Sequence, residues 1–129
     1  MTIELRMLAF SIILGFVHIV LSSHAASLQY GYRWTAGARD ERKAPLVDVA
    51  GRLQRALNNF SETFPYFAAA VLMAHVVGQH STLTIWGAHL YFWARVAYLP
   101  LYAFGIPLAR SLVWNVAAVG IACILIAVL

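Results

Sequence analysis

Four apolar segments divide this 129-residue chain, and they limit the folds open to it more than any other feature. They run over residues 5–30, 52–78, 82–104 and 107–129. Each is about as long as the 20 or so apolar residues that a helix needs to cross a bilayer. Only 11% of the residues are charged, whereas a soluble domain carries about 25%. The sequence therefore predicts an all-α integral membrane protein, a single four-helix bundle over residues 1–129.

The first apolar segment has a competing interpretation, a cleaved signal peptide. Arg6 precedes its apolar core, and small residues follow the core near the string SHAAS, as they do at a signal cleavage site. Against this interpretation, the apolar region is long, Glu4 lies beside the positive charge, and little sequence of a secreted type follows. We therefore expect the segment to be retained as a multi-pass membrane helix in contact with lipid.

Basic residues predict how the chain crosses the membrane. Six of the nine lysines and arginines fall within residues 33–55, a seventh, Arg110, follows the third segment, and the short loop GQHST has none. Positive residues accumulate on cytoplasmic loops, which explains the basic net charge without a nucleic-acid partner. We expect the first and third loops in the cytoplasm and both termini outside. The short chain and short loops favour a bacterial inner membrane.

Polar side chains form a stripe along one face of each of the two middle segments. At about 100° per residue, the second segment aligns Arg52, Arg55, Asn59, Glu62 and Tyr66. The third segment aligns Tyr91, Arg95, Tyr98 and Tyr102 in the same way. An ionised side chain near the middle of a membrane helix costs at least about 2.5 kcal/mol, so Glu62 and Arg95 should face protein or a water-filled cavity. A purely structural Glu62–Arg95 pair is the simpler alternative, but it leaves the tyrosines unexplained.

Three prolines support a cavity between the helices. Pro65 and Pro100 each remove a backbone donor inside a segment and tend to kink the helix there. Pro107 is expected to open the fourth helix, which would place Arg110 and Ser111 near its positive end. An anion entering from the cytoplasm would meet this helix end together with the arginines of the second segment.

Two motifs then give the chain a family resemblance. RALNNFSETFP follows the pattern R-x-x-x-N-x-x-E-x-x-P, and RVAYLPLY follows R-x-x-Y-x-x-x-Y. With four spans and a basic first loop, they resemble the MAPEG family, the membrane-associated proteins of eicosanoid and glutathione metabolism. The resemblance implies a homotrimer of four-helix subunits. It also implies glutathione as a co-substrate, bound between adjacent subunits near the cytoplasmic side.

The resemblance assigns roles to individual residues. Arg110 would be the catalytic residue that stabilises the glutathione thiolate. The glutathione-binding residues would be Arg52, Arg55, Asn59, Glu62, Arg95, Tyr98, Tyr102 and Ser111. Thr63 and Leu57 depart from the Tyr and Gln that some family members have at these positions. The contact set for glutathione is therefore expected to differ in part from theirs.

Three functions fit these observations. The first is a glutathione-dependent membrane transferase, or a peroxidase or isomerase of the same kind, acting on a hydrophobic electrophile that arrives through the bilayer. The second is a non-catalytic scaffold of the same fold that binds a lipid or a thiol. The third, a haem protein, rests on His18, His75 and His89 as axial ligands across the bundle. No tight cluster of His, Asp, Glu and Cys predicts a metal site.

Overall fold

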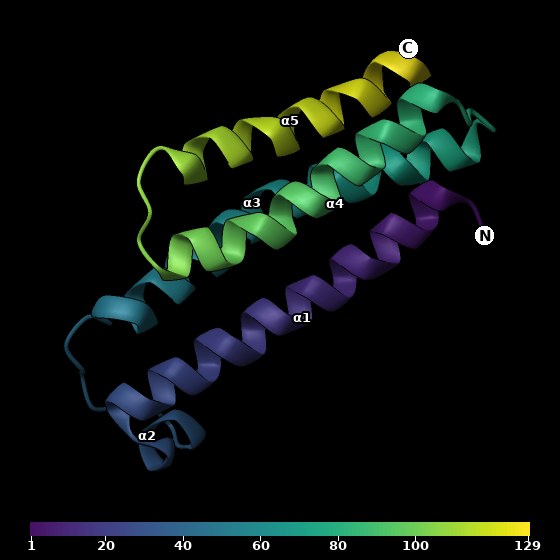
Figure 1. The fold of residues 1–129 in the computed structure, drawn as a ribbon. Coiled ribbons are helices and arrows are strands. Elements are labelled where there is room, and N and C mark those ends of the chain that lie inside the picture. The colour runs from purple at the N-terminus through teal and green to yellow at the C-terminus, as the bar shows by residue number, and fades with distance from the viewer.

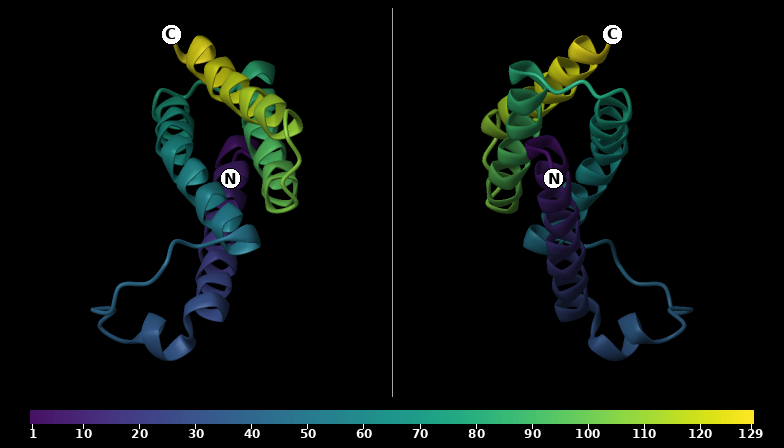
Figure 2. Two further views of the ribbon diagram at one scale, coloured as in Figure 1. Left: turned by 90° about the vertical axis from the view of Figure 1, so that its left-hand side faces the viewer. Right: turned by 90° about the vertical axis from the view of Figure 1, so that its right-hand side faces the viewer.

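The computed structural model describes all 129 residues and contains helices only (Figure 1). A short helix, α2, lies in the loop that follows the first long helix, and this loop extends to one side of the bundle (Figure 2). Both termini and the α3–α4 loop lie at one end, and the α4–α5 turn lies towards the other (Figure 1). The elements are α1 (Ile3–Tyr30), α2 (Tyr32–Ala36), α3 (Asp48–Val76), α4 (Thr82–Ala103) and α5 (Ala109–Val128).

The four long helices begin and end close to the predicted segment limits. The largest difference is at the start of α3, which begins four residues earlier than expected, at Asp48. Every other limit lies within two residues of the prediction, and α5 begins two residues later, at Ala109. Pro107 therefore precedes α5 and does not open it, because Leu108 has a φ of 61° and turns the chain before the helix starts. Arg110 still lies in the first turn of α5, as predicted.

Length and composition suit α1 and α5 to crossing a membrane. Their most apolar stretches have mean hydropathies of 2.0 and 2.3. The other two long helices carry the polar stripes, with Arg55 and Glu62 in α3 and Arg95 in α4, and these side chains lower their mean hydropathy. That all four helices cross the bilayer stays a prediction.

Close backbone packing joins α4 to α5. A Cβ atom added to Gly87 of α4 would lie 2.6 Å from the carbonyl oxygen of Gly120 in α5, and the reverse substitution would meet the Gly87 oxygen at the same distance. Only residues without a side chain allow helices to approach so closely. Phe67 of α3 stacks on Tyr91 of α4, with 3.9 Å between ring centroids. The stripe on α4 is thereby held between α3 and α5.

Hydrogen bonds tie α1 to the rest of the bundle at both ends. Near the termini, buried Glu4 accepts a hydrogen bond of 2.5 Å from the Thr84 hydroxyl at the start of α4. At the opposite end, the Gln29 amide donates to the Pro45 carbonyl over 3.1 Å and accepts from the Val47 backbone N–H over 3.0 Å. The first loop is therefore folded back on α1 just before α3 begins.

Candidate functional site

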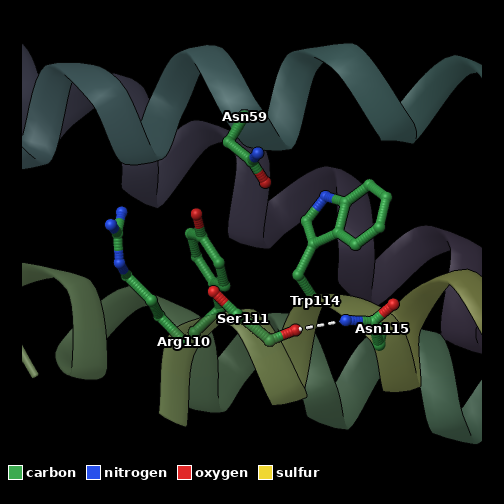
Figure 3. A pocket seen from close by; sticks show the side chains of 6 residues that line it. Asn59, Arg110, Ser111, Trp114 and Asn115 are labelled. Atoms are coloured by element: carbon green, nitrogen blue, oxygen red, sulfur yellow. Dashed lines mark hydrogen bonds between the residues drawn. The ribbon is translucent and has the colours of Figure 1, made fainter. Parts of the chain in front are cut away.

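Two adjoining cavities lie where α3, α4 and α5 face one another. The first, here called the arginine lobe, has a volume of about 300 Å³. It is lined by Arg55, Asn58, Asn59, Glu62, Tyr98, Tyr102 and Arg110. The second, the tryptophan lobe, has a volume of about 350 Å³ (Figure 3). It is lined by Asn59, Tyr98, Arg110, Ser111, Trp114 and Asn115. Because three residues line both lobes, the lobes meet at those residues.

Tyr102 brings the two arginines of the arginine lobe together. The Arg55 Nε atom donates a hydrogen bond of 3.2 Å to the Tyr102 hydroxyl. The Arg110 guanidinium lies over the same ring, 4.8 Å from its centroid, and the Arg55 guanidinium lies 5.8 Å from it. Cations are attracted to the face of an aromatic ring at such distances. One tyrosine of α4 therefore holds an arginine from α3 and one from α5 beside the same cavity.

Arg95 lies behind the cavities and lines neither of them. It is 1% exposed, and its two outer nitrogens donate hydrogen bonds to Asn59 Oδ1 over 2.7 Å and to Thr63 Oγ1 over 2.6 Å. The Thr63 hydroxyl shares a further hydrogen bond of 3.1 Å with the Tyr91 hydroxyl. The alternative Glu62–Arg95 pair is not formed, because the guanidinium is already taken by neutral partners.

Glu62 is exposed, and no cation of the chain lies within ion-pair distance of its carboxylate. The arginine lobe thus presents one free carboxylate, two guanidiniums and several neutral amide and hydroxyl groups. A guanidinium binds carboxylates and other anions, and a carboxylate binds an ammonium group. This arrangement is complementary to a small ligand that carries more negative than positive charge and has at least one ammonium group.

Two more of the predicted binding residues lie outside the arginine lobe. Arg52 donates a hydrogen bond of 2.8 Å from Nε to the Ala103 carbonyl at the end of α4, and it lines neither lobe. A cation at this end of a helix donates to a free carbonyl and is attracted to the negative end of the helix dipole. Ser111 lines the tryptophan lobe, and its carbonyl accepts a hydrogen bond of 2.8 Å from the Asn115 amide (Figure 3).

The sequence interpretation overlooked residues of α5 that line the tryptophan lobe. Trp114 lines the cavity and is 37% exposed. Asn115 is the only clearly polar side chain of α5 after Ser111. Helical spacing was the available signal, because Trp114 and Asn115 follow Arg110 and Ser111 by four residues and so lie on the same face.

The histidines considered as haem ligands each contact a different neighbour. His18 is buried and stacks on Phe60, with 5.0 Å between ring centroids, and neither ring nitrogen has a hydrogen-bond partner. His75 packs beside His80, with 5.7 Å between ring centroids. His89 accepts a hydrogen bond of 3.3 Å from a tryptophan of its own helix. No hydrogen bond or ring–ring contact joins any two of the three.

Comparison with known proteins gives the chain a family. No curated protein and no solved structure matches it. A model of the MAPEG family matches residues 7–129, which is nearly the whole chain and includes every residue that lines the two lobes. The family is membrane-associated and includes glutathione-dependent transferases together with other members. The chain therefore belongs to the MAPEG family.

Proposed function

We propose that the protein is a membrane transferase that binds glutathione in the arginine lobe and activates its thiolate. The thiolate would attack a hydrophobic electrophile that enters the tryptophan lobe from the bilayer. The observation that carries this proposal is the position of Arg110, which lines both lobes and so stands between the two expected reactants.

The charges of the arginine lobe suit glutathione. The tripeptide has two carboxylates, one ammonium group and one thiol. Arg55 offers a guanidinium to a carboxylate, and the free carboxylate of Glu62 offers an acceptor to the ammonium group. With Arg110 at the sulfur, the second carboxylate still needs a cation. The exposed arginines of the first loop, among them Arg33 and Arg42, are suitable candidates if a neighbouring subunit supplies them.

A homotrimer belongs to this proposal for a physical reason. Arg55, Glu62 and Arg110 are all exposed on the single chain. At membrane depth each such group costs at least about 2.5 kcal/mol when it faces lipid. Assembly of subunits around this face would remove the three groups from lipid and enclose the ligand between chains. The cytoplasmic position of the basic first loop, in a bacterial inner membrane, is part of the same proposal.

The chemistry assigned to Arg110 follows from the acidity of thiols. A free thiol has a pKa of about 8.5, so only a few per cent is thiolate at pH 7. A guanidinium next to the sulfur stabilises the anion, and a fall of two units in the thiol pKa would make about three quarters of it nucleophilic at pH 7. The thiolate then forms the carbon–sulfur bond while the electrophile releases its leaving group with the bonding electron pair.

Ultraviolet difference spectroscopy on the protein in detergent tests the proposal. Glutathione should produce a thiolate band at neutral pH with the parent protein, and Arg110→Ala should abolish it. Arg6→Ala is the matched control, because Arg6 is exposed near the start of α1 and lines neither lobe. Binding without a thiolate band in the parent protein would instead support the non-catalytic scaffold. No binding would refute the glutathione site.

A further inference from the structure

The orientation of the Asn59 amide is fixed by Arg95 behind it. An arginine guanidinium has five N–H donors and no acceptor. The Asn59 atom that lies 2.7 Å from Arg95 must therefore be the amide oxygen. The amide nitrogen, with its two N–H donors, is left to face away from Arg95.

The free side of this amide belongs to the cavities. Asn59 lines both lobes, and its side chain points from α3 into the space opposite Ser111 and Trp114 (Figure 3). Tyr98 and Arg110 are the other two residues that line both lobes. A thiol bound in one lobe can react with a molecule bound in the other only where the lobes meet. The reacting sulfur is therefore expected beside Asn59, Tyr98 and Arg110.

We infer that Arg95 is a positioning residue, which holds Asn59 so that its amide donates a hydrogen bond to the anionic sulfur of the bound thiol. The inference rests on the proposed function and extends it, because Arg95 becomes a support for a ligand contact and is not itself a contact. Asn59 and Arg110 then approach the sulfur from α3 and α5 respectively. A donor fixed before the ligand arrives needs little reorganisation to stabilise a developing or bound anion.

The surroundings of Arg95 explain how it can hold the amide. Its guanidinium lies 5.7 Å from the ring centroid of Tyr91 and 5.1 Å from that of Tyr98, so aromatic rings restrict its movement. Its second outer nitrogen is held by Thr63. Arg95 is the only residue of the chain that hydrogen-bonds the Asn59 amide, so Arg95 alone distinguishes its two ends. The oxygen could then turn towards the sulfur, where it would repel a thiolate.

The test compares two ligands that differ at the sulfur. Glutathione can bind as a thiolate, whereas S-methylglutathione is a thioether that cannot ionise. Dissociation constants for both are measured by calorimetry for the parent protein, Arg95→Met, Arg95→Lys, Asn59→Asp and Asn58→Asp. Arg95→Met removes the donor, and Arg95→Lys keeps a charged donor at the same position. Asn59→Asp keeps an acceptor for Arg95 but has no donor for the sulfur, and Asn58→Asp adds the same charge one residue away.

The inference predicts a loss that is specific to the thiol. A hydrogen bond to a charged group changes affinity by about tenfold or more, so Arg95→Met and Asn59→Asp should each lower the preference for glutathione over S-methylglutathione by about tenfold. Arg95→Lys should restore most of the preference lost in Arg95→Met. Asn58→Asp should weaken both ligands to a similar degree. Thermal unfolding in the same detergent shows whether each variant is folded.

Other results would overturn the inference. If Arg95→Met weakens both ligands equally, Arg95 supports the fold and does not orient Asn59 towards the sulfur. If Asn59→Asp leaves the preference unchanged, the amide does not donate to the sulfur, although glutathione binding itself would stand. If the parent protein binds neither ligand, the proposed function and this inference are both wrong.

Discussion

The contact between Gly87 and Gly120 allows a stability prediction with a magnitude taken from the structure. In Gly120→Ala, the new Cβ atom would lie 2.6 Å from the Gly87 carbonyl oxygen and 2.7 Å from the Tyr91 backbone nitrogen. Ordinary contacts of a Cβ atom begin near 3.4 Å. Both obstructing atoms belong to the backbone of α4, so neither can move without the helix. The substitution must therefore push α5 away from α4.

The expected cost follows from two opposing effects. Overpacking costs about 1–3 kcal/mol, and two backbone collisions at one site place this substitution at the upper end. Alanine in place of glycine within a helix stabilises the folded protein by about 1 kcal/mol. We expect Gly120→Ala to lower the free energy of unfolding by about 2 kcal/mol, which is roughly a thirtyfold change in the ratio of folded to unfolded protein.

A second glycine provides the matched control. In Gly15→Ala the new Cβ atom meets only the edge of the Phe60 ring, at 3.0 Å, and a side chain can move by a few tenths of an ångström. Its free energy of unfolding should stay within about 1 kcal/mol of the parent value, because the gain in helix propensity offsets the contact. The assay is loss of helical circular dichroism as SDS is titrated into protein in a mild detergent. The reasoning is refuted if Gly120→Ala proves as stable as Gly15→Ala.

Two further substitutions test the positions of side chains outside the lobes. Arg52→Ala should lower the free energy of unfolding by about 1 kcal/mol, because the last turn of α4 loses a donor and a favourable charge. Arg52→Ala should weaken glutathione binding, measured by calorimetry, less than Arg55→Ala does. A greater loss of affinity in Arg52→Ala would show that Arg52 does contact the ligand. His18→Phe should be at least as stable as the parent protein, with a free energy of unfolding up to about 1 kcal/mol higher. The reason is that the buried imidazole has two nitrogens without hydrogen-bond partners. A clear loss of stability in the SDS titration would show that His18 has a polar partner.

Helical periodicity explains why so much of the fold could be predicted from the sequence. Long apolar segments and the few residues between them place the helices to within a few residues, because the bilayer sets a minimum length and the loops leave little freedom. The short helix α2 carries no such signal. The start of α5 could not be placed from Pro107 alone, since proline fits both the first turn of a helix and the turn before it.

Helical periodicity could not identify the hydrogen-bond partners of Arg95. Relative to Asn59, Thr63 is rotated by about 40° around α3 in one direction and Glu62 by about 60° in the other. A stripe of this width contains all three residues, and the sequence alone does not show which edge of it faces α4. The structure turns the Thr63 edge towards Arg95 and leaves Glu62 facing the open cavity. Opposite charge makes Glu62 the partner of Arg95 that the sequence favours. The rotation of α3 about its axis instead brings Thr63 to the guanidinium.

The polar groups within the bundle separate into two sets with different consequences. Glu4 and Arg95 are buried and find their partners within the chain, through Thr84 in one case and through Asn59 and Thr63 in the other. These contacts connect helices, and of the Arg95 guanidinium only the buried Nε is left without a partner. The second set is the three charged side chains of the arginine lobe. Arg55, Glu62 and Arg110 are exposed on the single chain.

The second set would therefore bind the ligand and be covered by neighbouring subunits. Helices that needed only to pack together could replace these charges with apolar side chains at no loss of stability. Charges of both signs around one cavity instead match a small zwitterionic ligand with an excess of negative charge, as the proposed glutathione site requires. The same cost of exposing charge to lipid that disfavours the isolated subunit would favour its proposed trimer.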